Sequence, residues 1–453
     1  MKKIKSILFL FAALFVASSC EKFLDLKPQQ NLDTEVALSS DANVKTVLVS
    51  AYAIMRSSGI YGGCILRNSE LSGGTGEISW QGTYNGPREI YNHQIIAANG
   101  EITSQWLSSY ECVNICNNVL SALTVVNAED RETVEGEALF LRSFMYFDLV
   151  RFFGKNYEPG ATNSQLGVPL VLTPTGAIGN DNFVGRNTVE EVYAQVIKDL
   201  ERAATILPQV RPEGTSPYYA TSGAANALLA RVYLQKGDFA KARDAADKVI
   251  SSDVYSLTDT YAGAFNNEEY SSEDIFSTKF TSADGINQMT EFWSTTEYGG
   301  RDGDIEILDG HLNLYDPADE RYSLFWSGND AMRSGKWNTM YGLVNLFRLA
   351  EMYLIRAECN QRLGTSVGNT PVDDYNMTHT RAGLPAATSV TLDDILLERR
   401  LELAHEGFKL HDMKRLKQSV GSLPYNDPKL VYPIPAREIA ANPALKDQQN
   451  EGY

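Results

Sequence analysis

The sequence predicts an all-α fold, a scaffold of tetratricopeptide-like helical hairpins interrupted by two long loop-rich excursions. Residues 225–250 form the clearest hairpin pattern, with two amphipathic helices around the turn at Lys236-Gly237-Asp238. The positions where such hairpins need small or aromatic side chains are filled by Ala230, Tyr233, Ala242 and Ala246. Residues 347–364 look like the first half of another hairpin. These two patterns indicate a stack of paired helices.

Other stretches with helical spacing complete the predicted scaffold. Asp41 is expected to cap a helix whose apolar side chains fall on one face through Met55. Helical spacing returns from Ser104 to Val126 and from Glu129 to Phe153, where Gly154 is placed to end the helix. Thr188 opens a capping box, and that helix stops at Pro208. Residues 391–417 supply one more long helix, with a turn expected at Gly407.

The two excursions, about 58–100 and 258–345, lack a sustained period. They are rich in glycine, asparagine and aromatic residues. Long connections inside a compact domain are more often functional than accidental. We therefore expect any binding site to lie in these two segments.

The N-terminus has the order of a bacterial lipoprotein signal. A basic start with Lys2, Lys3 and Lys5 precedes the apolar run 7–16. This run is too short to span a bilayer, and it leads through small residues to Cys20. A cysteine at this point offers a thiol for lipid attachment. We predict a signal peptide over 1–19, a lipidated tether over 20–40 and a single domain over 41–453; a plain secreted protein with a chance cysteine is the alternative.

Charge and cysteine usage exclude several functions. The net charge is −17 and no basic run follows the first residues, so a nucleic acid partner is not expected. Cys112 and Cys116 lie four apart on a predicted helix, a spacing that suits neither a disulfide nor, without further ligands nearby, a zinc site. We interpret them as buried thiols.

Catalytic and metal motifs are absent or incomplete. His405-Glu406 lacks the second histidine of a zinc protease, because position 409 is lysine. The residues Asp302, Asp304 and Glu306 alternate like a calcium loop without its glycine, so a looser calcium site is left open and no other cofactor is expected. No catalytic residue is assigned. A glycosidase needs only two well-placed carboxylates, which a sequence cannot display, so a surface glycosidase remains an alternative.

Several blocks, taken together and in order, resemble the SusD/RagB family of outer-membrane lipoproteins. They are SCEKFLDLKP after the signal, GEALFLRSFMYFDLVRFFG at 136–154, the hairpin ending at 250, FRLAEMYLIRAE, RAGLP at 381–385, ILLERRLELAHEGFKLHDMKRL, YPIPAREIAANPAL and a terminal Gly452-Tyr453. The chain departs from the family pattern at Phe408 and His411, and at Asn156-Tyr157. These positions lie in packing segments at helix ends.

The resemblance implies a non-enzymatic nutrient-binding protein at the cell surface. Members of this family are mostly helical and form the ligand site from loops. They sit as a lid on a SusC-like TonB-dependent transporter barrel and pass oligosaccharide into it. By this resemblance, acylated Cys20 would hold the protein on outer-membrane lipid, and the tether would raise its effective concentration at the barrel. A peptide cargo for the same lid is the other alternative.

Candidate glycan-binding residues come from the two excursions. An aromatic ring can cover an apolar face of a pyranose, and planar polar groups can bind its hydroxyls in pairs. Both residue types are interleaved in residues 79–94 and 291–304. The predicted ligand-binding residues are Trp80, Gln81, Tyr84, Asn85, Arg88, Trp293, Tyr298, Arg301, Asp302 and Trp326. In the segment LYDPADERYS, we expect Asp316, Asp319 and Arg321 to form a loop-bracing ion network.

Overall fold

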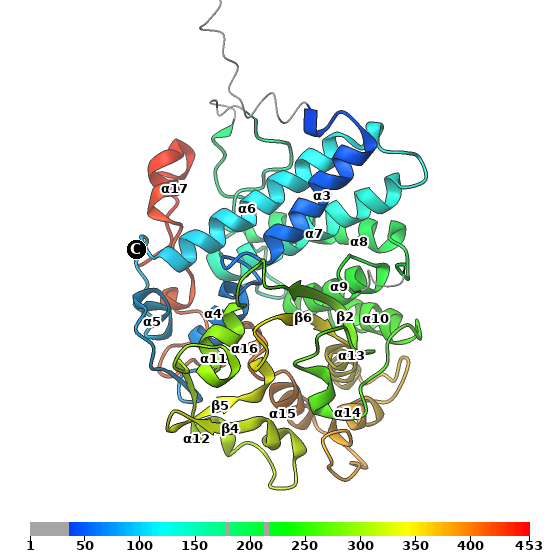
Figure 1. Cartoon of the computed structure of the whole chain (residues 1–453), viewed down its shortest axis with the longest axis vertical. Coiled ribbons are helices and arrows are strands. Elements are labelled where there is room, and N and C mark those ends of the chain that lie inside the picture. The colour runs from blue at the N-terminus through cyan, green and yellow to red at the C-terminus, as the bar shows by residue number, and fades with distance from the viewer. Residues whose placement is uncertain (1–35, 177–178, 180–181, 213–216) are drawn as a thin grey trace, which may run out of the picture.

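A sequential stack of helices forms one side of the molecule. The computed structural model describes residues 36–176, 179, 182–212 and 217–453. Each helix of the stack packs against the next, and Figure 1 shows the series running from α3 and α6 to α10 and α13. The stack contains α3 (Asp41–Met55), α6 (Gly100–Ser121), α7 (Arg131–Phe153), α8 (Val189–Ile206), α9 (Ser222–Lys236), α10 (Phe239–Ile250), α13 (Leu349–Leu363), α14 (Pro371–His379) and α15 (Leu392–Glu402). The predicted helical-hairpin scaffold is confirmed.

The helix ends follow the capping signals with small shifts. The Thr188 side chain and the Glu191 carboxylate form the predicted capping box at α8. The predicted hairpin turn is formed by Gly237, which has a φ of 76° at the end of α9. The cap of α3 is Ser40 and not Asp41, which is the first helical residue. The helix predicted from Ser104 begins earlier, at Gly100, because the Asn99 side chain accepts hydrogen bonds from its first turn.

The centre of the core lies where α7 meets a two-stranded sheet. Strand β2 (Asp274–Phe280) pairs antiparallel with β6 (Gly342–Arg348). The ring of Phe140 on α7 packs 5.0 Å from Phe276 of β2, and the ring of Phe144 packs 5.1 Å from Phe347 of β6. This contact joins the second excursion to the helix stack.

The two excursions contain more regular structure than their sequence suggests. The first holds α4 (Cys64–Gly73), β1 (Ile78–Trp80) and α5 (Asn85–Tyr91). The second holds a 3-10 turn (Tyr261–Ala264) before β2 and ends in β6. Between β2 and β6 lie α11 (Gln288–Trp293), β3 (Ile305–Ile307), α12 (Asp309–Leu312), β4 (Phe325–Gly328) and β5 (Ala331–Ser334). Short helices and strands thus lie within the predicted loop-rich excursions. Every residue of α4 is buried, including the polar residues Arg67, Asn68, Ser69 and Glu70.

The predicted long helix over 391–417 is also wrong. It is divided into α15, which ends at Glu402, and the short α16 (Lys409–Arg415). The chain reverses between them, with His405 at φ 64° and Gly407 at φ 86°. A side chain at Gly407 would bring its Cβ within 2.7 Å of Leu66 on α4, so glycine is needed for both its backbone conformation and its space. The turn expected at Gly407 is confirmed. The last helix, α17 (Ala436–Ala441), lies apart from the stack in Figure 1.

Buried ion pairs join the second excursion to the turn between α15 and α16. Arg348 at the end of β6 pairs with Glu273, Glu402 and Glu406, and Lys336 pairs with Glu406 at 2.6 Å. Figure 1 shows α15 and α16 below β6, and Glu406 lies in the turn between these two helices. A buried charge needs such partners, because taking it out of water unpaired is costly. The network fixes the second excursion on the helical scaffold.

The predicted bracing by Asp319 and Arg321 is confirmed, and Arg321 also reaches Glu402 of the network above at 3.7 Å. The Arg321 guanidinium binds the Asp319 carboxylate and reaches Glu398 of α15 at 2.7 Å. Asp316 is not part of this network, because its carboxylate accepts the backbone N–H of Ala318.

Two further expectations concern thiols and the membrane. Cys64, Cys112, Cys116 and Cys359 are buried and free, so the interpretation as buried thiols is confirmed. Among the residues that the structure describes, no helix combines the length and the apolar character needed to cross a membrane. The predicted signal peptide and Cys20 lie outside the described residues.

Candidate functional site

The two excursions meet through a short sheet. Strand β1 from the first pairs antiparallel with β3 from the second, with Ile78 opposite Ile307 and Trp80 opposite Ile305. The backbone N–H of Gln81 extends the pairing by donating to the carbonyl of Asp304 at 2.7 Å. The sheet therefore places the residues after β1 beside the residues before β3. These are the two segments from which the sequence predicts ligand-binding side chains.

Arg301 organises the contact between the two segments. Its guanidinium lies 4.3 Å above the Tyr84 ring and donates to the Tyr84 hydroxyl at 2.9 Å. It also donates to Thr83 Oγ1 at 3.3 Å and to the Asp304 carboxylate at 3.0 Å. The close approach depends on Gly82, where an added Cβ would come within 2.7 Å of the Asp304 carboxyl carbon. Tyr84 and Arg301 are thereby fixed as a stacked pair at the surface.

A β-hairpin adds the third aromatic residue. β4 and β5 pair antiparallel around Asn329-Asp330, both with positive φ. The Asn329 side chain donates to the backbone carbonyl of Asp302 at 2.9 Å, which joins the hairpin to the loop before β3. Trp326 on β4 packs edge-on against Tyr298, with ring centroids 5.0 Å apart. We call the resulting set the loop surface and define it as Gln81, Tyr84, Asn85, Tyr298, Arg301, Asp302 and Trp326.

Two of the predicted tryptophans do not belong to this surface. Trp293 is 0% exposed and packs against the His405 ring at 4.7 Å. Trp80 is buried against Phe292 at 5.7 Å. Both rings therefore fill the interior beneath the loops, so neither face is available to a sugar in this structure. The stacking role predicted for Trp80 and Trp293 is corrected on this ground.

The predicted polar residues differ in whether their side chains already form hydrogen bonds within the protein. Gln81 is exposed and its amide donates to Glu306 at 3.2 Å. Asp302 and Asn85 are exposed. Arg88 is exposed too, but it donates to the carbonyl of Gly82 at 2.6 Å and to Asn85 at 3.3 Å. Arg88 thus braces the loop, while the Asp302 carboxylate, the Gln81 amide oxygen and the Asn85 amide nitrogen have no partner among the described residues.

The acidic residues that suggested a calcium loop are used in other ways. Asp304 is paired with Arg301, and Glu306 accepts from Gln81. Over the described ranges, no group of three or more histidine, cysteine, aspartate or glutamate side chains is arranged to hold a metal ion. Partial burial raises the pKa of Asp304 above its ordinary value even though Arg301 donates to it. Burial opposes the charged form of Arg301, but the hydrogen bond and charge of Asp304 outweigh it and raise the pKa of Arg301.

Three residues of this site were not predicted from the sequence. Thr83 accepts from Arg301, Asn329 holds the hairpin on the loop, and Phe292 supports the Tyr84 ring from below at 5.9 Å. The Asn329-Asp330 pair between two short apolar runs is a signal for a two-residue hairpin turn and would have located β4 and β5. Nothing in the sequence indicates the support by Phe292.

Two family models match this chain in succession. A model described as starch-binding, associating with the outer membrane, matches residues 22–234. The SusD family model matches residues 255–426. The first match contains Tyr84 and the second contains Arg301, so the loop surface draws on both.

Relatives and solved structures agree with these matches. SusD-like protein P2 of Formosa agariphila is 24% identical over 95% of this chain and 96% of its own length. A SusD superfamily protein from Bacteroides thetaiotaomicron has a TM-score of 0.81 at 25% identity, covering 91% of this chain and 99% of that one. A putative sugar binding protein from Bacteroides vulgatus has a TM-score of 0.80 at 26% identity, with the same coverage. With matches in order along most of its length and the shared helical fold, the chain belongs to the SusD/RagB family.

Proposed function

We propose that the loop surface binds an oligosaccharide without catalysis. The observation that carries this proposal is the pair Tyr84–Arg301, because an exposed ring stands beside a fixed planar donor. Tyr84 is 46% exposed although the Arg301 guanidinium covers part of its ring. A pyranose can pack an apolar face on the open part of the ring and direct its hydroxyls at the neighbouring polar groups.

The remaining members of the loop surface suit an extended ligand. Tyr298 and Trp326 form a second aromatic position, and Tyr298 is exposed. Gln81, Asn85 and Asp302 supply amide and carboxylate groups that face the solvent. The match to a solved putative sugar binding protein and to a starch-binding family model supports sugar as the ligand class.

We propose further that the protein acts at the cell surface as the lid of a SusC-like TonB-dependent transporter. The family model's association with the outer membrane supports this location. In this proposal the thiol of Cys20 carries the lipid anchor, and the chain delivers its oligosaccharide to the barrel. Replacing Cys20 by serine should release the protein from the membrane fraction. Retention of the unlipidated variant at the cell surface at wild-type level contradicts the anchor.

Binding is tested by isothermal titration against a panel of oligosaccharides. Tyr84→Ala should weaken binding of a recognised sugar at least tenfold, and Tyr298→Ala should weaken binding of longer chains. The matched control is Tyr270→Ala, because Tyr270 is 44% exposed and packs against Tyr218, away from the loop surface. Equal affinity of the Tyr84 and Tyr270 variants would show that the sugar binds elsewhere.

The enzymatic alternative is tested on the same protein. Incubation with the polysaccharide from which a recognised sugar derives should release no new reducing ends. Release of reducing ends that disappears when Asp304 is replaced by asparagine would replace the binding proposal with a glycosidase.

A further inference from the structure

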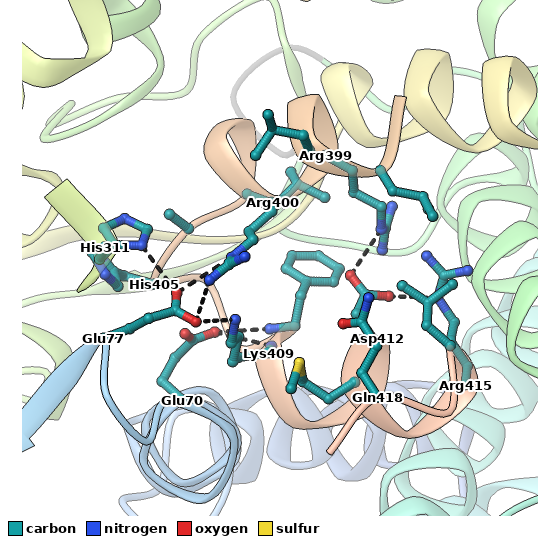
Figure 2. Close-up of a pocket in the computed structure, with 18 of the residues that line it drawn as sticks. Glu70, Glu77, His311, Arg399, Arg400, His405, Lys409, Asp412, Arg415 and Gln418 are labelled. Atoms are coloured by element: carbon teal, nitrogen blue, oxygen red, sulfur yellow. Dashed lines mark hydrogen bonds and ion pairs between the residues drawn. The ribbon is translucent and has the colours of Figure 1, made fainter. Parts of the chain in front are cut away.

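Ion pairs are distributed differently in the pocket of Figure 2 and at the loop surface. In that pocket, the carboxylate of Asp412 lies between Arg399 Nε at 2.9 Å and Arg415 Nε at 2.6 Å. One acid there has two cationic neighbours. The loop surface has the reverse arrangement, with several acids around one arginine. This difference decides how the loop surface would receive a charged sugar.

Arg301 is the cation at the centre of the loop surface, and its charge is already shared by two acids. Its Nε donates at 3.0 Å to the carboxylate of Asp304, which is buried. Its backbone N–H donates at 2.9 Å to the carbonyl of Glu291. Burial works against the charged form of Arg301, yet the carboxylates of Asp304 and Glu291 raise its pKa. A ligand carboxylate would therefore meet an arginine whose charge is already balanced.

Asp302 adds a carboxylate that is not paired. The side chain is exposed, and Asn329 donates only to its backbone carbonyl, so no donor in the described ranges binds the carboxylate. Its charge is felt by the neighbouring acid. Burial raises the pKa of Asp304, and the charge of Asp302 adds to this rise although Arg301 opposes it. A further negative charge from a ligand would be disfavoured for the same reason.

Two more acids flank the loop surface. Glu297 precedes Tyr298 in the same turn, and Asp330 lies at the tip of the hairpin that carries Trp326. Both are exposed, and neither forms an ion pair with another described residue. The exposed cation nearby is Arg88, which also lacks an acidic partner there. Counted with Asp302, at least three unpaired acids thus surround the loop surface against this one unpaired arginine.

The open hydrogen-bonding atoms of the loop surface favour a ligand that can donate. Within the part of the chain that the structure describes, the Asp302 carboxylate and the Gln81 amide oxygen are acceptors without a partner, and the Asn85 amide nitrogen is a donor without one. A sugar hydroxyl can donate to the first two groups and accept from the third. The oxygens of an ionised uronate or a sulfate ester only accept, so they would leave Asp302 unsatisfied.

We propose that the loop surface selects uncharged oligosaccharides and rejects chains that carry uronate or sulfate groups, with Asp302 as the specificity-determining residue. This inference rests on the proposed function, because it assumes that the sugar lies on the Tyr84–Arg301 pair. The repulsion acts over a distance that salt controls, since the Debye length falls from about 30 Å at about 0.01 M salt to about 8 Å at about 0.15 M. Rejection should therefore be strongest at low salt.

Selectivity is tested by isothermal titration with neutral oligosaccharides and with the same chains oxidised at C6 to uronates, which keep the linkage. The neutral probes are hexamers of maltose, cellulose, laminarin and mannan type, and alginate and polygalacturonate hexamers complete the panel. At about 0.01 M salt the neutral form should bind at least tenfold more tightly than its uronate, and this ratio should fall at least threefold at about 0.5 M.

The outcomes separate this inference from the proposed function. Equal or tighter binding of the uronates, or binding of alginate or polygalacturonate alone, overturns the selectivity and leaves sugar binding in place. A preference that does not change with salt reflects the lost C6 hydroxyl instead of charge, and it also overturns the inference. Absence of binding by every member of the panel overturns the proposed function itself, and the inference with it.

The role of Asp302 is tested by changing its charge. Asp302→Asn should lower the neutral-to-uronate affinity ratio at least threefold, and Asp302→Lys should abolish the preference. Because the side chain is exposed and unpartnered among the described residues, both variants should fold like the wild type. Glu129→Gln and Glu129→Lys change the net charge equally at an exposed position before α7 and serve as controls. An unchanged ratio in Asp302→Lys, or an equal loss in Glu129→Lys, refutes the assignment of Asp302.

Discussion

The stability of the Glu70→Gln variant relative to the wild type should be greater at alkaline pH than at acidic pH. Glu70 is buried on α4, and its Oε1 accepts the backbone N–H groups of Gly407, Phe408 and Lys409. Burial raises the pKa of Glu70 from 4.5 to about 7, although these hydrogen bonds and the charge of Lys409 oppose the shift. A glutamine can still accept the backbone N–H groups but carries no charge at any pH.

The sign and size of this pH-dependent change in stability follow from proton linkage. Between the two pKa values the folded protein holds the Glu70 proton more tightly than the unfolded chain does, so the wild type loses stability as the pH rises. Each pKa unit of the shift from 4.5 to about 7 is worth about 1.36 kcal/mol. Part of this stability is already lost below about pH 5, and about 2.5 kcal/mol is lost between about pH 5 and about pH 8.5. The glutamine variant does not have this loss.

The assay is urea denaturation of wild type and Glu70→Gln at both pH values. The free-energy difference between variant and wild type should favour the variant by about 2.5 kcal/mol more at the higher pH. Glu129→Gln, at an exposed position, serves as control and should show the same difference at both pH values. If the Glu70 variant behaves like the Glu129 variant, the carboxylate is not destabilised by burial and the reasoning is refuted.

Three further changes test the turn and the buried ion pairs by the same denaturation assay. Gly407→Ala should lower the free energy of unfolding by at least ~2 kcal/mol, because the φ of 86° and the contact with Leu66 both exclude a side chain. The control Gly100→Ala, with open space around it, should be neutral or stabilising. Equal effects of the two substitutions would contradict the role of the turn. Arg348→Met should lower the free energy of unfolding by roughly 3–5 kcal/mol, because it leaves three buried carboxylates with one cation fewer. The control Arg202→Met, at the exposed pair with Glu135, should lower it by under about 1 kcal/mol. A small loss at Arg348 would mean that the buried network is not needed for stability. Arg399 and Arg415 hold the pKa of Asp412 at about 2. The free energy of unfolding of the wild type should therefore fall by up to about 2 kcal/mol as the pH falls from about 4 through about 2, and Asp412→Asn should lack that loss. Parallel pH profiles of the two proteins would contradict this role of the Asp412 carboxylate.

The helical scaffold was predictable because its signals are local. The hairpin at 225–250 and the capping box at Thr188 each depend on residues within one or two helical turns, and the structure places both as expected. The buried α4 was not predictable by the same means. Every residue of CILRNSELSG is buried, polar and apolar alike, so the residue types do not reveal that this helix is covered on all sides.

The loop surface was predictable in composition but not in arrangement. Tyr84 and Arg301 were selected as ligand-binding types, yet the stacked contact between them depends on strand pairing across more than 200 residues of chain. Trp293 is a residue whose burial could not be predicted from the sequence. On the six-residue α11 no period indicates which face points inward, and the structure turns that ring into the core.

Because β1 and β3 come from opposite halves of the chain, neither half carries the complete loop surface. A fragment that stops after α10 keeps the tyrosine but not the arginine that clamps it, and the complementary fragment has the reverse defect. The loop surface therefore forms only after β3 has been synthesised and both halves of the chain have docked.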